Sequence, residues 1–231
     1  MSEPDLDKIV AGLGDGPITF LEPGTPGPAQ LPSRWRPIAE AARPADRCAA
    51  ALSLWNPDFL AALPRFVRAL TDNLTDVRVC RLRGDWTLVY VATAGSGEQI
   101  TWIGWDPAGF GPSRPVFWET LPEPFRRFLV DVHAGFTASD GESYGLTHPS
   151  GMLTYAAWGG FDGPIPGWDD HGRISSTGLM FVTRDSGLLH YCVAPELPPG
   201  SVALVYEGDI DIKPDIAREL DQLMAERFDL G

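Results

Sequence analysis

Two histidines and two carboxylates lie within one short stretch of the chain, HAGFTASDGESYGLTH. His133, Asp140, Glu142 and His148 are residue types that bind metal ions or transfer protons. No pair among them has the HExxH spacing that places two ligands on one face of a helix. His133 follows a predicted helix end, where an imidazole can cap carbonyl groups, and Asp140 and Glu142 are typical of a turn. The pattern favours a structural role, and a small hydrolase using this loop is the alternative.

A later loop combines an aromatic side chain with charged ones. Trp168, Asp169, Asp170 and His171 follow one another in a stretch rich in Gly and Pro. Loops on a rigid scaffold often carry recognition residues, and a Trp beside acids is typical of hot spots in protein interfaces. These four residues could bind a cation or a basic partner residue, and a plain solvated turn is the alternative.

A second acidic pattern lies in YEGDIDI, residues 206–212. On one strand, Glu207, Asp209 and Asp211 would share a face, because successive side chains point to opposite sides. That face is either an acidic edge for a basic partner or the wet side of an ordinary strand. Asp140 and Glu142 could contribute to the same kind of acidic, partner-binding surface.

Other catalytic signatures are missing. The glycine pairs in GSG at 95–97 and GFG at 109–111 do not open a helix with a following Lys-Ser/Thr, so neither predicts a phosphate-binding loop. The G-x-S-x-G word of serine hydrolases does not occur. We therefore expect no catalytic residue, no cofactor and no metal.

Charge and composition narrow the class of partner. The 231 residues include 31 acids and 18 bases, for a formal charge of −13. Such a field repels phosphates, so nucleic acid is an unlikely ligand, whereas a basic protein would be attracted. The 25 Gly and 22 Pro residues predict many turns and long loops.

The chain shows no sign of a membrane or secretory protein. Its longest apolar runs fall short of a membrane span, and its start, MSEPDLDKIVAGLGDG, is acidic rather than basic and apolar. We therefore expect a cytoplasmic protein. The three cysteines, Cys48, Cys80 and Cys192, are odd in number and far apart, which predicts buried thiols rather than disulfides or a metal clip.

Hydrophobic periodicity predicts helices and strands in succession. The third helix begins with Asn56 and Pro57 at its cap and first turn, and prolines at positions 44 and 64 should break, kink or bend the second and third helices. The expected helices are 6–13, 37–54, 57–70, 121–135 and 214–231, and the expected strands are a three-stranded meander over 77–105, a strand at 152–159, a hairpin over 179–195 and one strand at 201–212.

The order of elements from residue 118 onward resembles a known family. A helix with the word LPEPFRRFL ends near Gly135, and a strand with Trp158, the hairpin LMFVTRDSGLLHYCVA, a further strand and an amphipathic helix follow. This order is similar to that of the SUKH superfamily, which includes the yeast Smi/Knr regulators and many bacterial immunity proteins. The resemblance covers about half of the chain. His133-Ala134-Gly135 stands where members often carry Asn-Gly-Gly.

The resemblance implies an α+β fold with a mixed or antiparallel sheet flanked by helices, extended by N-terminal helices and a β-meander. It divides the chain into residues 1–115, packed on the same core, and a SUKH-like core at 116–231. It also implies a protein without enzymatic activity that neutralises a cognate bacterial toxin by covering it. A regulatory scaffold without a toxin, as in the yeast members, is the further alternative.

Overall fold

The computed structural model describes residues 4–13, 17–168 and 174–229 of the chain. The helices are α1 Leu6–Gly12, α2 Arg36–Glu40, α3 Pro44–Leu52, α4 Pro57–Ala62, α5 Pro64–Asn73, α6 Glu123–Asp131, α7 Tyr155–Trp158 and α8 Ile216–Asp229. The strands are β1 Ile18–Phe20, β2 Leu74–Leu82, β3 Asp85–Thr93, β4 Gln99–Trp105, β5 Phe136–Ala138, β6 Met180–Arg184, β7 His190–Val193, β8 Val202–Tyr206 and β9 Asp209–Lys213.

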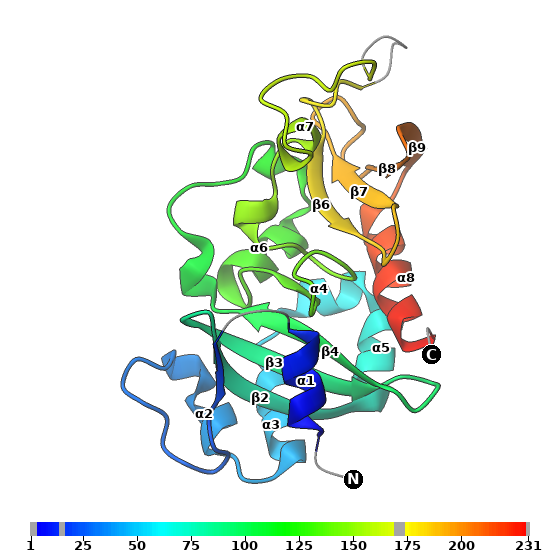
Figure 1. Ribbon diagram of the computed structural model, residues 1–231. Helices are drawn as coiled ribbons and strands as arrows, with labels where there is room; N and C mark the ends of the chain where they lie inside the picture. Colours follow the sequence, from blue (N-terminus) through cyan, green and yellow to red (C-terminus); the bar gives the residue numbers. More distant parts are fainter. Residues whose placement is uncertain (1–3, 14–16, 169–173, 230–231) are drawn as a thin grey trace.

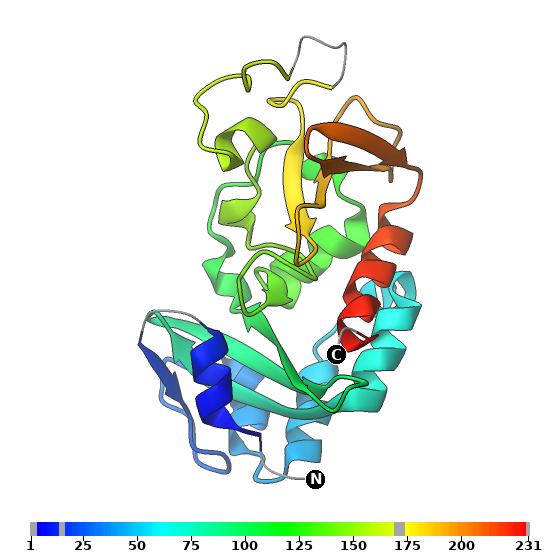
Figure 2. The same ribbon diagram turned by 45° about the vertical axis from the view of Figure 1, so that its right-hand side comes forward.

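The strands form two antiparallel sheets, which confirms the predicted α+β class. One sheet has the order β1-β2-β3-β4-β5 and the other has the order β6-β7-β8-β9. Figures 1 and 2 show the five-stranded sheet at the bottom and the four-stranded sheet at the top, with α6 between them and α8 along one side. The expected meander is β2-β3-β4, and β5, which follows α6 in the chain, pairs with β4.

Helices cover both faces of the five-stranded sheet. Ile9 and Leu13 at the α1 end pack on Cys80, Val89 and Ile103 of the sheet. Most side chains of β2 and β3 are buried, so both faces of these strands are covered. The face opposite α1 packs against the main core. In Figure 1, α1 lies in front of the sheet and α2, α3 and α5 lie behind it.

Aromatic side chains make the centre of the main core. Trp55 contacts Phe66, Tyr90, Phe128 and Phe136 with ring centroids 6.2, 5.9, 5.1 and 5.1 Å away. These five side chains come from segments on both sides of residue 115, so the main core includes residues from either part of the chain. The division of the chain at that position stays a prediction.

Prolines begin helices rather than bend them. The predicted helix at 37–54 is two helices, and Pro44 is the first residue of the second one. The predicted helix at 57–70 is likewise split, with Pro57 and Pro64 each at a first position. A proline lacks the N–H that an interior position needs, whereas the first turn leaves that N–H unpaired in any case.

A side chain from α8 completes the start of α5. Leu63, before α5, has no side-chain oxygen to cap it, and the carboxylate of Asp221 accepts the backbone N–H of Phe66 at 2.8 Å instead. Asp221 is buried, so this hydrogen bond is protected from water. The C-terminal helix is therefore joined to the N-terminal helices by a cap as well as by apolar packing.

The strand expected at 152–159 is wrong, because Tyr155–Trp158 is a short helix. The Thr154 hydroxyl accepts the N–H of Ala157, which is a typical helix cap. The helix expected to end at Gly135 ends at Asp131. Gly135 has φ of +103°, and a Cβ there would lie 2.8 Å from the backbone of His148, so this glycine permits a close approach of two chain segments.

No helix within residues 4–13, 17–168 and 174–229 combines the length and the apolar character of a membrane span.

Candidate functional site

The acidic stretch at 206–212 forms a hairpin tip, so the single strand expected at 201–212 is wrong. β8 and β9 are joined by the two-residue turn Glu207-Gly208, whose φ angles of +48° and +89° are those of a type I′ turn. Glu207 therefore lies in the turn rather than beside Asp209 and Asp211 on a strand. Tyr206 pairs with Asp209 across the hairpin, which places their side chains on one face.

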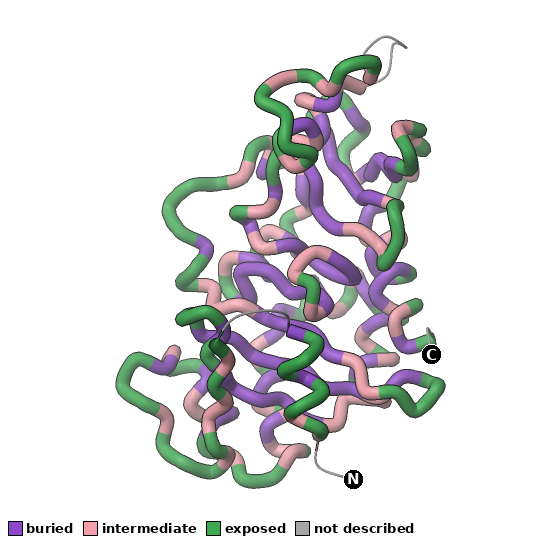
Figure 3. The backbone as a smooth tube through the Cα atoms, viewed as in Figure 1, coloured by how far each residue is buried: buried purple, intermediate pink, exposed green. Residues whose placement is uncertain are grey.

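β9 is the outer strand of its sheet, and β8 is its pairing partner among the described strands. Figure 3 shows that this end of the sheet is mostly exposed or intermediate, in contrast to the buried strands beside it. An outer strand presents backbone N–H and C=O groups to a partner. Among the described strands, β8 is therefore the single neighbour of β9, and the other side of β9 pairs with none of them.

Two large apolar side chains of the hairpin are exposed. Tyr206 is 49% exposed and Ile212 is 50% exposed. Ile212 lies on the face opposite Tyr206, because it pairs with Ala203. A strand added beside β9 would lie next to Ile212 on one face and next to Asp209 and Asp211 on the other, whereas Tyr206 lies one strand further away, on β8.

Carboxylates lie in the turn of the hairpin and on its Tyr206 face, whereas Ile212 lies on the opposite face. Glu207 and Asp211 are exposed, and Glu207 makes no ion pair within the described part of the chain. Asp211 pairs with the ammonium of Lys213 at 2.6 Å, and this hydrogen bond raises the pKa of Lys213. Asp209 is also exposed. Lys213 offsets the charge of Asp211, so the hairpin combines exposed apolar side chains with the carboxylate of Glu207 in its turn, a composition that suits contact with a basic protein.

Asp140 and Glu142 lie in the turn that the sequence predicts, and both pair with one arginine. The guanidinium of Arg184 is 3.2 Å from each carboxylate. Asp140 also accepts the backbone N–H groups of Glu142 and Ser143 at 3.1 and 2.9 Å. Burial raises the pKa of Asp140, but these hydrogen bonds and Arg184 together lower it below its ordinary value. Arg184 offsets one of the two charges and ties this turn to β6.

Trp168 packs against its own sheet. Its indole N–H donates to the carbonyl of Ile174 at 2.8 Å, and its ring lies 5.1 Å from that of Tyr155. The side chain is half-buried and belongs to a second apolar cluster on the outer face of the four-stranded sheet. Asp169, Asp170 and His171 lie outside the described residues.

His133 lies in the core. It is 0% exposed, and its Nε2 is 2.8 Å from the hydroxyl of Tyr90, while Nδ1 is 3.3 Å from the carbonyl of Trp105. A carbonyl only accepts, so Nδ1 carries the proton of the neutral imidazole, and Nε2 accepts the proton of Tyr90, whose hydroxyl in turn accepts the indole N–H of Trp55 at 3.1 Å. Burial lowers the pKa of His133 to about 3. The expectation that His133 caps a helix end is wrong.

His148 lies at the surface. Its Nδ1 accepts the N–H and the hydroxyl of Ser150 at 3.2 and 2.7 Å. Burial lowers the pKa of His148, although the charge of Asp85 and the carbonyl of Gly109 raise it. It lines surface hollows together with Trp105 and Asp85, and His133 lines none of them. Of the four residues of the hydrolase alternative, Asp140, Glu142 and His148 line one surface hollow, and His133 does not.

The Ser150–His148 contact resembles a catalytic dyad in distance alone. A serine nucleophile also needs N–H donors that stabilise an oxyanion. The N–H of Ser150 donates to His148 Nδ1, that of Gly151 to the carbonyl of His148, and that of Met152 to the carbonyl of Pro149. These donors are already used, so the pair acts as the cap of the short 3-10 turn Pro149–Gly151.

Within the described residues, no cluster of three or more His, Cys, Asp or Glu side chains could hold a metal ion. The residues that the sequence patterns missed are Tyr206, Ile212 and Arg184. The signal for the first two is the Glu207-Gly208 pair between two alternating runs, which is typical of a two-residue hairpin turn. No such local signal exists for Arg184, because its partners are distant along the chain. Asp140, for example, is 44 residues away.

Comparison with protein-family models, with curated proteins and with solved structures gives no match for this chain.

Proposed function

We propose that this protein is an immunity protein that binds and neutralises a cognate bacterial toxin through the β8–β9 hairpin. The observation that carries the proposal is the exposure of Tyr206 and Ile212 on the outer strand of a sheet, with the exposed carboxylates of Glu207 and Asp211 beside them. Large apolar side chains with an acidic rim are typical of a binding surface.

Long-range charge supports a basic partner. The formal charge of −13 would attract a basic protein from a distance, and the carboxylates of the hairpin would orient it on arrival. Many polymorphic toxins act on nucleic acids or carry other basic sites, as the resemblance to the SUKH superfamily implies. The proposal places the protein in the cytoplasm, where such a toxin would act on its own producer.

The proposed mechanism is occlusion without chemistry. A toxin segment lies beside β9, and its backbone completes the hydrogen-bonding edge of the sheet. Basic side chains of the toxin meet Glu207 and Asp211, while apolar groups cover Tyr206 and Ile212. Because the same carboxylates repel phosphates, a bound toxin loses access to a nucleic acid substrate at this face.

The test is affinity capture of the tagged protein from its native lysate at low and high salt. We expect one stoichiometric basic protein that is released as the salt concentration rises, because salt screens exposed charges. That protein, expressed alone in a host cell, should arrest growth, and co-expression with the captured chain should restore it. The proposal is overturned if no basic protein is retained at either salt concentration, or if the captured protein is harmless.

Variants of the hairpin test the surface. The double substitution Tyr206→Ser and Ile212→Ser should abolish capture and growth rescue. Leu188→Ser is the matched control, because Leu188 is 55% exposed on the β6–β7 connection of the same sheet. Equal capture by both variants would show that the partner binds elsewhere.

A further inference from the structure

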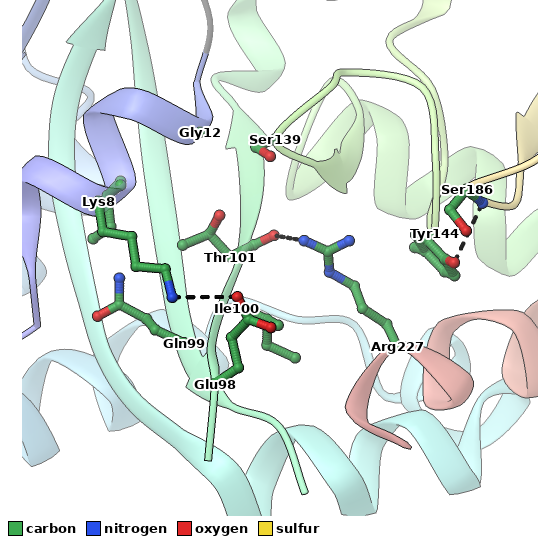
Figure 4. Close-up of a pocket in the computed structure, with 11 residues that line it drawn as sticks. Lys8, Gly12, Glu98, Gln99, Ile100, Thr101, Ser139, Tyr144, Ser186 and Arg227 are labelled. Carbon is green, nitrogen blue, oxygen red and sulfur yellow. Dashed lines mark hydrogen bonds and ion pairs between the residues drawn. The ribbon is translucent and has the colours of Figure 1, made fainter. Parts of the chain in front are cut away.

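A pocket opens where the five-stranded sheet meets the second part of the molecule (Figure 4). Its volume is about 340 Å³, which is sufficient for a small ligand. Its walls come from α1, from the beginning of β4, from the segment after β5, from the β6–β7 connection and from α8. Four of its side chains carry the argument, namely Lys8, Glu98, Tyr144 and Arg227.

Arg227 is a cation without a carboxylate. It is half-buried, and no ion pair of the described residues includes it. Burial lowers the pKa of Arg227, and Tyr144, Asp140 and Glu98 offset part of that change. The contrast with Arg47 is informative, because that buried guanidinium binds Asp76 through two hydrogen bonds of 2.7 and 2.8 Å. A guanidinium with little solvent and no anion is an unsatisfied binding group.

Arg227 is also held in place. One terminal nitrogen donates to the carbonyl of Thr101 at 3.1 Å. The guanidinium lies 5.1 Å from the ring centre of Trp102 and 5.3 Å from that of Tyr144, so two aromatic rings hold it by cation–π attraction. Figure 4 shows the other terminal nitrogen directed away from Thr101, toward the side of the pocket where Tyr144 lies.

Tyr144 supplies a second donor. Its side chain is 4% exposed, and its hydroxyl accepts the backbone N–H of Ser186 at 3.2 Å. A hydroxyl that accepts one hydrogen bond can still donate its own proton, and that proton has no acceptor among the described residues. Tyr144 has φ of +54°, an uncommon conformation for a non-glycine residue that is often found at functional positions.

We propose that this pocket binds a small organic carboxylate, with Arg227 and Tyr144 as the two groups that hold its oxygens. Arg227 contributes the charge and its remaining N–H groups, and Tyr144 contributes the O–H. Lys8 is offset by Glu98, with 3.2 Å between the ammonium and the carboxylate, so the pocket keeps one net positive charge. One positive charge in a molecule of −13 suits a singly charged group better than a phosphate dianion.

The ligand would join distant parts of the chain. Arg227 belongs to α8, Thr101 to β4 and Tyr144 to the segment that precedes β6. A carboxylate between them would therefore stabilise the contact of the two sheets. This inference is independent of the toxin-binding proposal, because the pocket shares no residue with the β8–β9 hairpin.

The test is calorimetric titration of the full chain with monovalent and divalent probes. We expect saturable binding of acetate and propionate, at least tenfold weaker binding of succinate and inorganic phosphate, which carry more negative charge, and no binding of propionamide, which has the shape of propionate without its charge. Equal affinity for propionate and propionamide, tighter binding of succinate or phosphate, or no heat from either monocarboxylate would overturn the proposal.

Two variants locate the site, and a third controls for charge. Arg227→Met should abolish binding, and Tyr144→Phe, which removes one hydroxyl, should weaken it about tenfold without loss of the fold. Arg68→Met removes a charge from an arginine whose side chain is 86% exposed, and it should bind like the wild type. Unchanged affinity in Tyr144→Phe, or an equal loss in Arg68→Met, would show that the carboxylate binds elsewhere or without specificity.

Discussion

The two sheets of the molecule differ in the length and exposure of their edge strands. The five-stranded sheet ends in the three-residue strands β1 and β5, and most of β2 and β3 is buried. The four-stranded sheet ends in β9, in which every residue is exposed or intermediate. A short edge strand limits pairing with other chains, whereas a longer exposed one permits it. The edge strand β9 thus keeps a surface that the core does not cover, although β6, β7 and β8 of the same sheet are mostly buried.

We expect the largest loss of stability when the carboxylate of Asp76 is removed from the five-stranded sheet. Asp76 is 0% exposed and binds the buried Arg47, so Asp76→Ala leaves an unpaired charge in the core. We expect a loss of about 3–5 kcal/mol in the free energy of unfolding, measured by urea denaturation.

Asp72→Ala is the control for this loss. Its carboxylate is 65% exposed and lies 3.8 Å from Arg68, and such a pair contributes about 1 kcal/mol or less. A similar effect of the two substitutions would contradict the assignment of Asp76 as a buried structural charge.

A pH titration should give the next largest effect, because His133 lies against the same sheet. Its pKa is about 3 when folded and about 6.5 in the unfolded chain, so the unfolded state binds the proton first as the pH falls. The contribution of His133 to stability is complete above pH 6.5 and is lost progressively toward pH 3, by up to about 1.4 kcal/mol per pH unit.

Urea denaturation between pH 7 and pH 5 measures this loss before most carboxylates titrate. The variant His133→Gln removes the proton-binding group and should flatten the pH dependence, even if its stability is lower at every pH. A wild-type stability that is constant over this range would contradict a neutral, buried His133.

The smallest effect is expected on the second sheet. Tyr206→Ser and Ile212→Ser each remove a side chain that is about half exposed, so each should change the free energy of unfolding by roughly 0.5 kcal/mol or less. Urea denaturation of the single variants gives the value. A loss near that of Asp76→Ala would show that the β8–β9 hairpin is packed for stability, and the contrast between the sheets would fail.

The contrast between buried and exposed elements also explains which parts of the fold can be predicted from the sequence. The stripe of Phe125, Phe128 and Leu129 at helical spacing predicts α6, and its three residues are buried. The alternation around Val77 and Val79 predicts β2 in the same way. Regular elements with a buried face follow from local periodicity because burial repeats with the period of the element.

Short elements and single side chains were harder to predict. The four residues of α7 are too few to show a helical period, and the cap at Thr154 decides their conformation. The state of His133 depends on Tyr90, which is 43 residues away along the chain, and on burial that no local pattern encodes. The acids at 207–211 predict an acidic surface, but the exposed apolar side chains of Tyr206 and Ile212 depend on which strand lies at the edge of the sheet.

The cap that Asp221 provides for α5 also bears on the order of events during synthesis. The ribosome makes α8 after every other described element, and domains generally begin to fold from the N-terminal side. Until Asp221 emerges, the N–H of Phe66 lacks its acceptor, and Trp102 lacks the ring of Phe228 that packs 5.0 Å from it. A nascent chain can therefore assemble the first sheet early, but it completes the main core only after α8 has left the ribosome.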